Sequence, residues 1–291
     1  MGRVSRRARI TRFRTDGTIS RRDDMLAGEE PLEIRFEGRS FTVTMRTPGD
    51  DFDLVAGFLV SEGVIWEAGQ LISLRYCAGV DEDGQQTFNV VDVQLRPGTP
   101  LPDTGMERHV YTSSSCGICG TASIEAVRKS SHFDVASDGV RVPLEVLASL
   151  PDKLREQQAL FEKTGGVHAA GLFTAEGELL CLREDVGRHN AVDKVVGWAL
   201  RAGLLPLRGT VLQVSGRASF ELVQKAQLAG IPVLAAVSAP SALSVELAQD
   251  AGMTLVGFSR GTSLNCYCFP ERIEAKAAAV AGASSGAGTG A

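Results

Sequence analysis

The first hundred residues alternate hydrophobic and polar positions in short runs. Residues 32–36 and 41–45 alternate strictly on either side of Glu37-Gly38-Arg39, which predicts a β-hairpin. After residues 47–50, Thr-Pro-Gly-Asp, apolar residues recur at helical spacing and predict a helix. A second hairpin is predicted over residues 71–95. We therefore expect this part of the chain to be a mixed α+β unit.

From about residue 150 the pattern changes to continuous apolar strands that alternate with short helices. Such an alternation is typical of a mostly parallel sheet that is covered by helices on both faces, in three α/β/α layers. The strands are expected at residues 167–173, 179–183, 210–214, 232–237 and 253–258, and the helices at 153–163, 191–201, 218–228 and 242–250.

The change of pattern predicts two domains with a boundary near residue 140. Residues 29–140 are expected to form the α+β domain with a mobile Cys-x-x-Cys loop, and residues 141–273 the α/β domain. Residues 1–28 are rich in arginine and residues 274–291 in alanine and glycine, so both are expected to be disordered tails.

Composition and charge exclude several classes of protein. The chain of 291 residues has a formal net charge of −5, which argues against nucleic-acid binding. No run of residues is long and apolar enough for a membrane span, and no apolar segment of a secretion signal follows the arginines. Six cysteines are too few for a disulfide scaffold, so we expect a reducing, cytoplasmic setting.

Cys116 and Cys119, in Ser-Ser-Ser-Cys-Gly-Ile-Cys-Gly, are the chemical centre of the sequence. Three interpretations are open: half of a zinc site completed by Cys266 and Cys268, a redox-active dithiol, or a reactive thiolate that carries a group. Haem attachment would need a histidine where Gly120 stands. The small residues around the pair favour an exposed carrier thiol, because such a sulfur must reach both a donor and an acceptor.

Several strand ends bring glycine, arginine and small hydroxyl residues together. Ligands bind open parallel sheets at the carboxyl ends of the strands, and arginine forks and glycine turns suit phosphate. A pyrophosphate or nucleotide site is therefore plausible, although no Walker or Gly-x-Gly-x-x-Gly motif is present. The alternative is that the arginines pair with carboxylates such as Glu184 and Asp185. The segments are residues 183–190, 215–219, 238–241 and 258–263, and their arginines are Arg188, Arg217 and Arg260.

The remaining candidates have weaker patterns. His189 could be an acid–base group, a phosphate ligand or a helix-capping residue. Cys77 and Cys181 lie in strand patterns, where a buried and inert thiol is expected. His168 is followed by two alanines, and no Pro-Cys-x-x-Cys comes after it, so the zinc deaminase signature is absent.

These motifs together resemble the FdhD/NarQ family of sulfurtransferases, accessory proteins of formate dehydrogenase. The resemblance covers about residues 30 to 270 and rests on residues 114–120, 165–170, 184–194, 215–219, 238–242 and 257–260. It implies an α/β domain similar to the cytidine deaminase fold without its zinc site, in a homodimer.

The resemblance also implies a function. Members accept persulfide sulfur from a cysteine desulfurase and transfer it to the molybdenum bis(molybdopterin guanine dinucleotide) cofactor for formate dehydrogenase. Cys116 corresponds to the persulfide carrier, with Cys119 assisting. The family's cofactor-binding segment maps onto Phe258, Ser259, Arg260, Gly261, Thr262 and Ser263. The alternative hypothesis is a zinc-stabilised, cofactor-delivering chaperone without covalent sulfur transfer.

Overall fold

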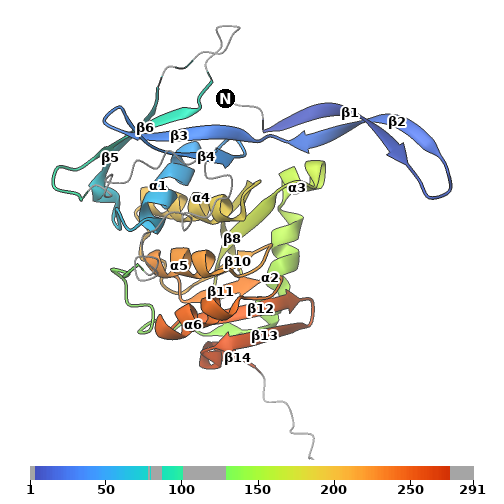
Figure 1. The fold of residues 1–291 in the computed structure, drawn as a ribbon. Coiled ribbons are helices and arrows are strands. Elements are labelled where there is room, and N and C mark those ends of the chain that lie inside the picture. Colours follow the sequence, from blue (N-terminus) through green and yellow to red (C-terminus); the bar gives the residue numbers. More distant parts are fainter. Residues whose placement is uncertain (1–3, 78, 80–86, 101–128, 276–291) are drawn as a thin grey trace, which may run out of the picture.

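The computed structural model describes residues 4–77, 79, 87–100 and 129–275 (Figure 1). Cys116 and Cys119, the predicted turn within residues 71–95, and the predicted tail from residue 276 onward lie outside the described residues.

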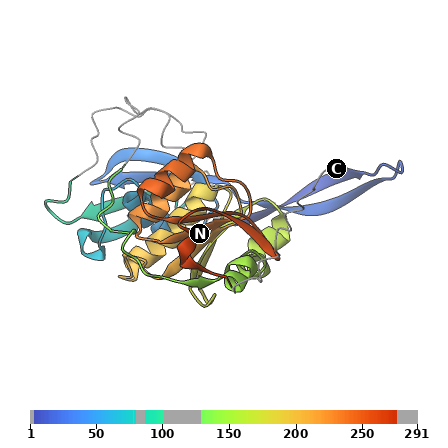
Figure 2. The ribbon, with the colours of Figure 1, turned by 90° about the horizontal axis from the view of Figure 1, so that it is seen from below.

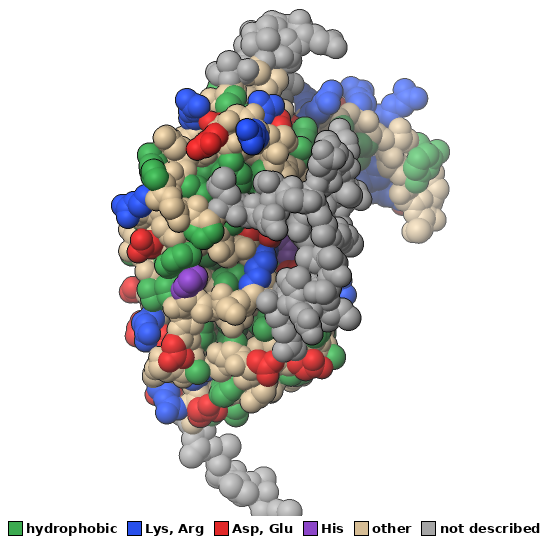
Figure 3. Space-filling view, turned by 60° about the vertical axis from the view of Figure 1, so that its left-hand side comes forward, with side chains coloured by type: hydrophobic (Ala, Val, Ile, Leu, Met, Phe, Trp, Pro, Cys, Tyr) green, Lys and Arg blue, Asp and Glu red, His purple; other side chains and the backbone are tan. Residues whose placement is uncertain are grey.

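The arginine-rich start of the chain is a β-hairpin that projects from the body (Figure 1). Strand β1 (Ser5–Phe13) pairs with β2 (Ile19–Ala27) antiparallel in an unbroken register. The expectation of a disordered tail is wrong for this stretch, because cross-strand arginine–aspartate pairs such as Arg7–Asp23 offset the positive charge. Figure 3 shows Lys and Arg side chains gathered on this hairpin, whereas the two signs of charge are mixed over the rest of the visible face.

A four-stranded sheet with the order β4-β3-β6-β5 forms the N-terminal part. Both predicted hairpins are present, since β3 pairs with β4 and β5 with β6 antiparallel, and the predicted helix is α1. The bounds are β3 (Glu30–Phe36), β4 (Arg39–Arg46), α1 (Asp51–Ser61), β5 (Leu71–Tyr76) and β6 (Val90–Leu95), with a 3-10 turn at Ala68–Gln70.

A six-stranded sheet with the order β13-β12-β11-β10-β8-β9 forms the C-terminal part. The prediction of a mostly parallel sheet is wrong, because only β10, β11 and β12 pair in parallel. Tight turns reverse the chain at Gly177 (φ 82°) and Gly261 (φ 53°), so β8–β9 and β12–β13 are antiparallel hairpins. The bounds are β8 (His168–Thr174), β9 (Leu179–Asp185), β10 (Thr210–Val214), β11 (Val233–Ala236), β12 (Thr254–Arg260) and β13 (Ser263–Cys268).

Helices cover both faces of this sheet, which confirms the three-layer α/β/α prediction (Figure 2). Leu172 and Leu212 face α4 to α6, whereas Phe173 and Val211 face α2, as the alternation of a strand requires. The predicted helix over residues 153–163 is two helices that meet at an angle, α2 and α3. The bounds are α2 (Leu144–Glu156), α3 (Ala159–Thr164), α4 (Arg188–Arg201), α5 (Phe220–Leu228) and α6 (Ala242–Asp250), and the short pieces β7 (Val142–Pro143), β14 (Ile273–Glu274) and Pro270–Arg272 lie beside them.

Helices α1 and α4 join the two parts of the chain. A Cβ atom on Gly57 would lie 1.8 Å from the carbonyl oxygen of Asp193, and one on Gly197 would lie 1.8 Å from that of Asp53. The two backbones therefore touch without side chains between them. One hydrophobic core continues from β3 and β6 through these helices to β10, and the predicted boundary near residue 140 stays a prediction. Within the described ranges, no helix has the length and apolar character to cross a membrane.

Candidate functional site

One edge of the six-stranded sheet collects the predicted ligand-binding segments. Strand β9 is antiparallel to β8, which is antiparallel to β10, so β9 runs in the same direction as β10, β11 and β12. The carboxyl ends of these four strands therefore lie on one edge, together with the start of β8 at His168 and of β13 at Ser263. The structure brings together the segments that the sequence placed at strand ends.

A cavity of about 530 Å³ opens at this edge. Its volume falls within the range of small-molecule sites, roughly 300–1,000 Å³. Strand ends form one wall, and α2 with α3 forms another, which the sequence analysis did not anticipate. The lining residues are Pro151, Asp152, Leu154, Arg155, Gln158, Phe161, Gly165, Gly166, Val167, His168, Val186, Ser215, Val237, Ser259, Arg260 and Gly261.

The segment of residues 258–263 bends sharply where β12 ends. Phe258 (φ 51°) and Gly261 (φ 53°) both have left-handed backbone, and the β12–β13 register shifts between them. Ser259 is fully buried, and its Oγ donates to the carbonyl oxygen of Leu147 at 3.2 Å, so this hydroxyl is committed to α2. Thr262 and Ser263 are exposed.

Arg260 is the charged side chain of this segment. It is exposed and lines the cavity, and its Nε donates to the carbonyl oxygen of Val237 at 3.3 Å. This bond uses one edge of the guanidinium and anchors it to the end of β11. The terminal nitrogens have no carboxylate partner among the described residues, so they are available to an anion.

His168, Gly216 and Arg188 lie against one another beside the cavity. A Cβ atom on Gly216 would lie 3.6 Å from Nδ1 of His168 and 3.9 Å from Cδ of Arg188, so a glycine leaves room for both side chains. Burial, with the positive charge of Arg188 nearby, holds the pKa of His168 below its usual range. The ring is therefore neutral at pH 7. The Nε of Arg188 is buried and, within the described part of the chain, has no hydrogen-bond partner.

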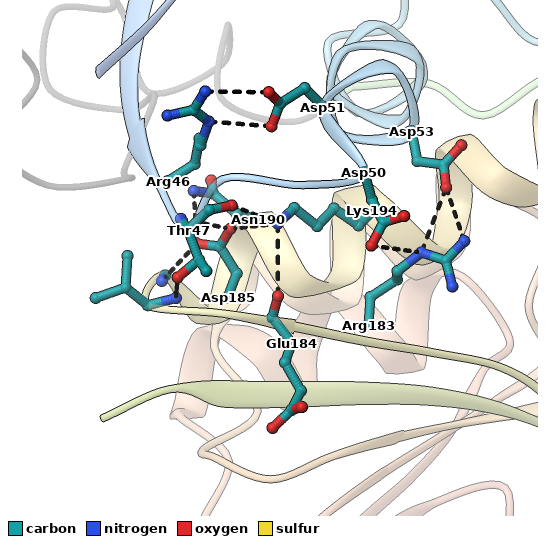
Figure 4. Close-up of polar contacts among 12 residues, drawn as sticks. Arg46, Thr47, Asp50, Asp51, Asp53, Arg183, Glu184, Asp185, Asn190 and Lys194 are labelled. Carbon is teal, nitrogen blue, oxygen red and sulfur yellow. Dashed lines mark hydrogen bonds and ion pairs between the residues drawn. The ribbon is translucent and has the colours of Figure 1, made fainter. Parts of the chain in front are cut away.

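The carboxylates that could have neutralised Arg188 are engaged elsewhere. Glu184 accepts hydrogen bonds from the backbone N–H groups of Leu160 and Phe161, each at 2.8 Å. Asp185 Oδ2 lies 2.8 Å from Nζ of Lys194 (Figure 4). The alternative that Arg188 pairs with these two carboxylates is therefore wrong, and no ion pair to another described residue neutralises its charge.

Asp185 and Lys194 are part of a polar network that fixes the start of α1 to the sheet (Figure 4). Lys194 Nζ donates to the carbonyl oxygen of Thr47 at 2.9 Å, and Asp185 accepts from the backbone N–H of Thr47 at 3.1 Å. Burial raises the pKa of Asp185, and the Lys194 ammonium opposes that rise. Farther along, Arg183 contacts Asp53 at 2.8 Å. The N-terminal part is thereby held against the edge that carries the cavity.

Arg217 and His189 are not among the residues that line the cavity, and neither are Arg188, Phe258, Thr262 and Ser263. Arg217 is exposed, and no contact with another described residue defines a role for it. His189 is buried, and its Nε2 lies 2.7 Å from the carboxylate of Glu221 and 3.4 Å from Oγ of Ser219. Of the roles left open for His189, bracing α4 against the start of α5 is the one that these contacts support.

Comparison with known proteins places the chain in a family. The model of the FdhD/NarQ family matches residues 27–274. This chain belongs to the FdhD/NarQ family. Proteins named Sulfur carrier protein FdhD are 60% identical to it over 283 residues in Streptomyces avermitilis, covering 97% of this chain and 100% of that protein, and 42% identical over 269 residues in Sulfolobus acidocaldarius, covering 92% and 98%.

A solved structure has the same FdhD/NarQ architecture. It is that of a protein from Desulfotalea psychrophila proposed as a formate dehydrogenase accessory protein, with 26% sequence identity and a TM-score of 0.72. The superposition covers 94% of this chain and 100% of that one. The resemblance first seen in the motifs is confirmed, and the expected mixed fold with it.

The cysteines of this FdhD/NarQ chain separate into two groups. Cys116 and Cys119 lie outside the described residues, so their roles stay predictions. Cys181 is buried, which raises its pKa to about 12 and confirms the expected inert thiol, whereas the same expectation is wrong for Cys77, which is half-buried and follows the end of β5. The thiols of Cys266 and Cys268 donate to the carbonyl oxygens of Cys268 and Val245, at 3.2 and 3.5 Å. Burial raises the pKa of both thiols.

Proposed function

We propose that this protein is a sulfur carrier that takes persulfide sulfur from a cysteine desulfurase and transfers it to the molybdenum bis(molybdopterin guanine dinucleotide) cofactor for formate dehydrogenase. The observation that carries the proposal is the cavity at the sheet edge, which Arg260 lines without a carboxylate partner among the described residues, with Arg188 close to the lining residue His168. The name of the relatives supports the sulfur-carrier role. A carrier thiol must stay reduced to accept sulfur, which fits the reducing environment of the cytoplasm.

Loading of the carrier is a thiol–persulfide exchange. The thiolate of Cys116 attacks the outer sulfur of the desulfurase persulfide, and the bond between the two desulfurase sulfurs breaks. The desulfurase cysteine leaves as a thiolate, and Cys116 becomes the persulfide. Because one sulfur–sulfur bond is exchanged for another, this step needs no oxidant or reductant.

Delivery requires the sulfur to be reduced by two electrons, since it leaves as a sulfide ligand of the acceptor. Cys119, spaced for a disulfide with Cys116, can supply them: its thiolate attacks the inner sulfur of the persulfide, hydrosulfide leaves toward the acceptor, and a Cys116–Cys119 disulfide remains. A cytoplasmic dithiol reductant then restores both thiols. The acceptor is a substrate of this chain, and its phosphates are the anions that suit the basic cavity.

Persulfide formation tests the sulfur step directly. The purified chain is incubated with a cysteine desulfurase and cysteine, and the peptides are analysed by mass spectrometry. The mass of one extra sulfur is expected on the peptide that contains Cys116, and Cys116→Ser should abolish it. Cys77→Ser is the matched control and should load normally. Stoichiometric zinc without any persulfide would instead support the cofactor-delivering chaperone.

Nucleotide binding tests the acceptor site. Arg260→Ala should weaken binding of GDP about tenfold or more in calorimetry, because a charge-assisted hydrogen bond contributes about 1.5–3 kcal/mol. Arg208→Ala is the control, since Arg208 is also exposed but precedes β10, at the opposite edge of the sheet. Equal affinities of the two variants would rule out an acceptor site at residues 258–263. The homodimer stays a prediction.

A further inference from the structure

The α2–α3 wall of the cavity contains an acidic side chain without a partner. Among the described residues that line the cavity, Asp152 is the one carboxylate. It lies on α2, is exposed, and has no ion pair or hydrogen bond within the described ranges. Arg155, one helical turn farther on, pairs with Glu162 at 3.4 Å instead. The oxygens of Asp152 are therefore free to accept hydrogen bonds from a ligand.

Beside this carboxylate lies a flat surface. The guanidinium of Arg155 is stacked over the ring of Phe161, with its central carbon 4.4 Å from the ring centroid. Glu184 holds the backbone that carries this ring, because it accepts hydrogen bonds from the backbone N–H groups of Leu160 and Phe161. Arginine planes and aromatic rings are the surfaces on which proteins stack nucleobases. The wall thus offers a platform and an acceptor next to each other.

The opposite wall has different chemistry. Arg260 and Gly261 lie at the end of β12, and His168 and Ser215 lie at the start of β8 and the end of β10. These residues offer cationic and neutral donors, which suit phosphate oxygens. A ligand that satisfies both walls has a planar ring with hydrogen-bond donors at one end and phosphates at the other, which describes a nucleotide.

The single carboxylate decides between the bases. The Watson–Crick edge of guanine presents two adjacent donors, N1–H and the N2 amino group, to which one carboxylate can bind with both oxygens. Adenine presents an acceptor at its N1 position, which a carboxylate repels. We propose that Asp152, with the Arg155–Phe161 platform, is a guanine-recognition subsite of this cavity. The inference rests on the proposed function and assigns the base end of the acceptor to α2 and α3.

Calorimetry with GDP, IDP and ADP tests the subsite on the full chain. IDP is the sharpest probe because it lacks only the N2 amino group. The wild-type chain should bind GDP about tenfold or more tightly than IDP, and ADP more weakly still, since a bidentate contact gives discrimination of this order. In Asp152→Asn the GDP-to-IDP ratio should fall to near one, whereas Glu156→Gln, on the same helix but outside the cavity lining, should keep it.

A second variant separates stacking from base selection. Phe161→Leu removes the ring under Arg155 and should weaken GDP and IDP by the same factor, leaving their ratio unchanged. Circular dichroism confirms that each variant is folded. If the wild-type chain binds GDP and Asp152→Asn keeps the wild-type ratio of GDP to IDP affinity, the proposed guanine subsite is wrong. The proposed acceptor site is then still supported. If the wild-type chain does not bind GDP, the acceptor part of the proposed function fails with it.

Discussion

Removing the charge of Lys194 should destabilise the protein strongly. Lys194 and Asp185 are 1% and 0% exposed, and their charged atoms lie 2.8 Å apart. Lys194→Met keeps a long apolar side chain but leaves the carboxylate of Asp185 buried without a cation. Three hydrogen-bond donors remain to it, the backbone N–H groups of Thr47 and Gly187 and the side-chain amide of Asn190.

The magnitude follows from the burial of the pair. Breaking a buried ion pair by removing one partner costs about 3–5 kcal/mol. Because three donors remain, we expect a loss of about 3 kcal/mol at pH 7, a large part of a total stability of about 5–15 kcal/mol. Without the cation, burial raises the pKa of Asp185 further. The folded state then holds a proton that the unfolded state releases, so the loss should shrink as the pH falls toward the unfolded pKa.

Urea unfolding followed by tryptophan fluorescence measures these free energies at pH 7 and pH 5. The double variant Lys194→Met/Asp185→Asn is the control, because it leaves no uncompensated charge and should recover a large part of the loss. A loss below about 1 kcal/mol at pH 7, the value of an exposed pair, would refute the reasoning. A loss that grows from pH 7 to pH 5 would refute the assignment of Asp185 as the titrating group.

Three further predictions follow from the fold. Gly197→Ala should lower the free energy of unfolding by at least about 3 kcal/mol, since its Cβ would lie 1.8 Å from a backbone oxygen, whereas Gly139→Ala, with no atom within 4 Å, should be neutral in thermal melts. Cys181 should react with maleimide only in urea, and labelling of the native protein would contradict its burial. Deleting residues 1–26 should change the free energy of unfolding by less than about 1 kcal/mol, because an isolated two-stranded hairpin is marginally stable, and a failure to fold would show that the hairpin supports the core.

Hydrophobic periodicity correctly predicted several helices and strands whose apolar residues face the core. The strand at residues 210–214 and the helix at 242–250 have the bounds that the pattern indicated, because their apolar residues meet the core on one face or on both. Pairing direction was mispredicted, because the apolar residues of a strand such as β9 do not show which way its neighbour runs. Strand β13 was not predicted at all, since its residues are mostly polar and exposed. The turns at Gly177 and Gly261 decide the direction.

The sequence predicted one wall of the candidate site and missed the other. Strand ends can be located in a sequence, so Arg260 and Ser215 were placed at one edge, whereas His168, at the start of a strand, was not. Asp152, Arg155 and Phe161 were missed because the sequence does not show that α2 and α3 pack beside the strand ends that form the cavity. The left-handed backbone at Phe258 is likewise a tertiary effect, since phenylalanine has no local preference for it.

The backbone contact between α1 and α4 also determines how the molecule opens. Where side chains separate two helices, rotamer changes let the helices slide past each other by small steps. At Gly57 and Gly197 the backbones of α1 and α4 are in direct contact, so no side chain can adjust in this way. The N-terminal sheet can leave the α/β part only when the two helices separate completely. The amide hydrogens of α1 and α4 should therefore exchange with solvent in one shared event, so that two parts with different architectures behave as one cooperative unit.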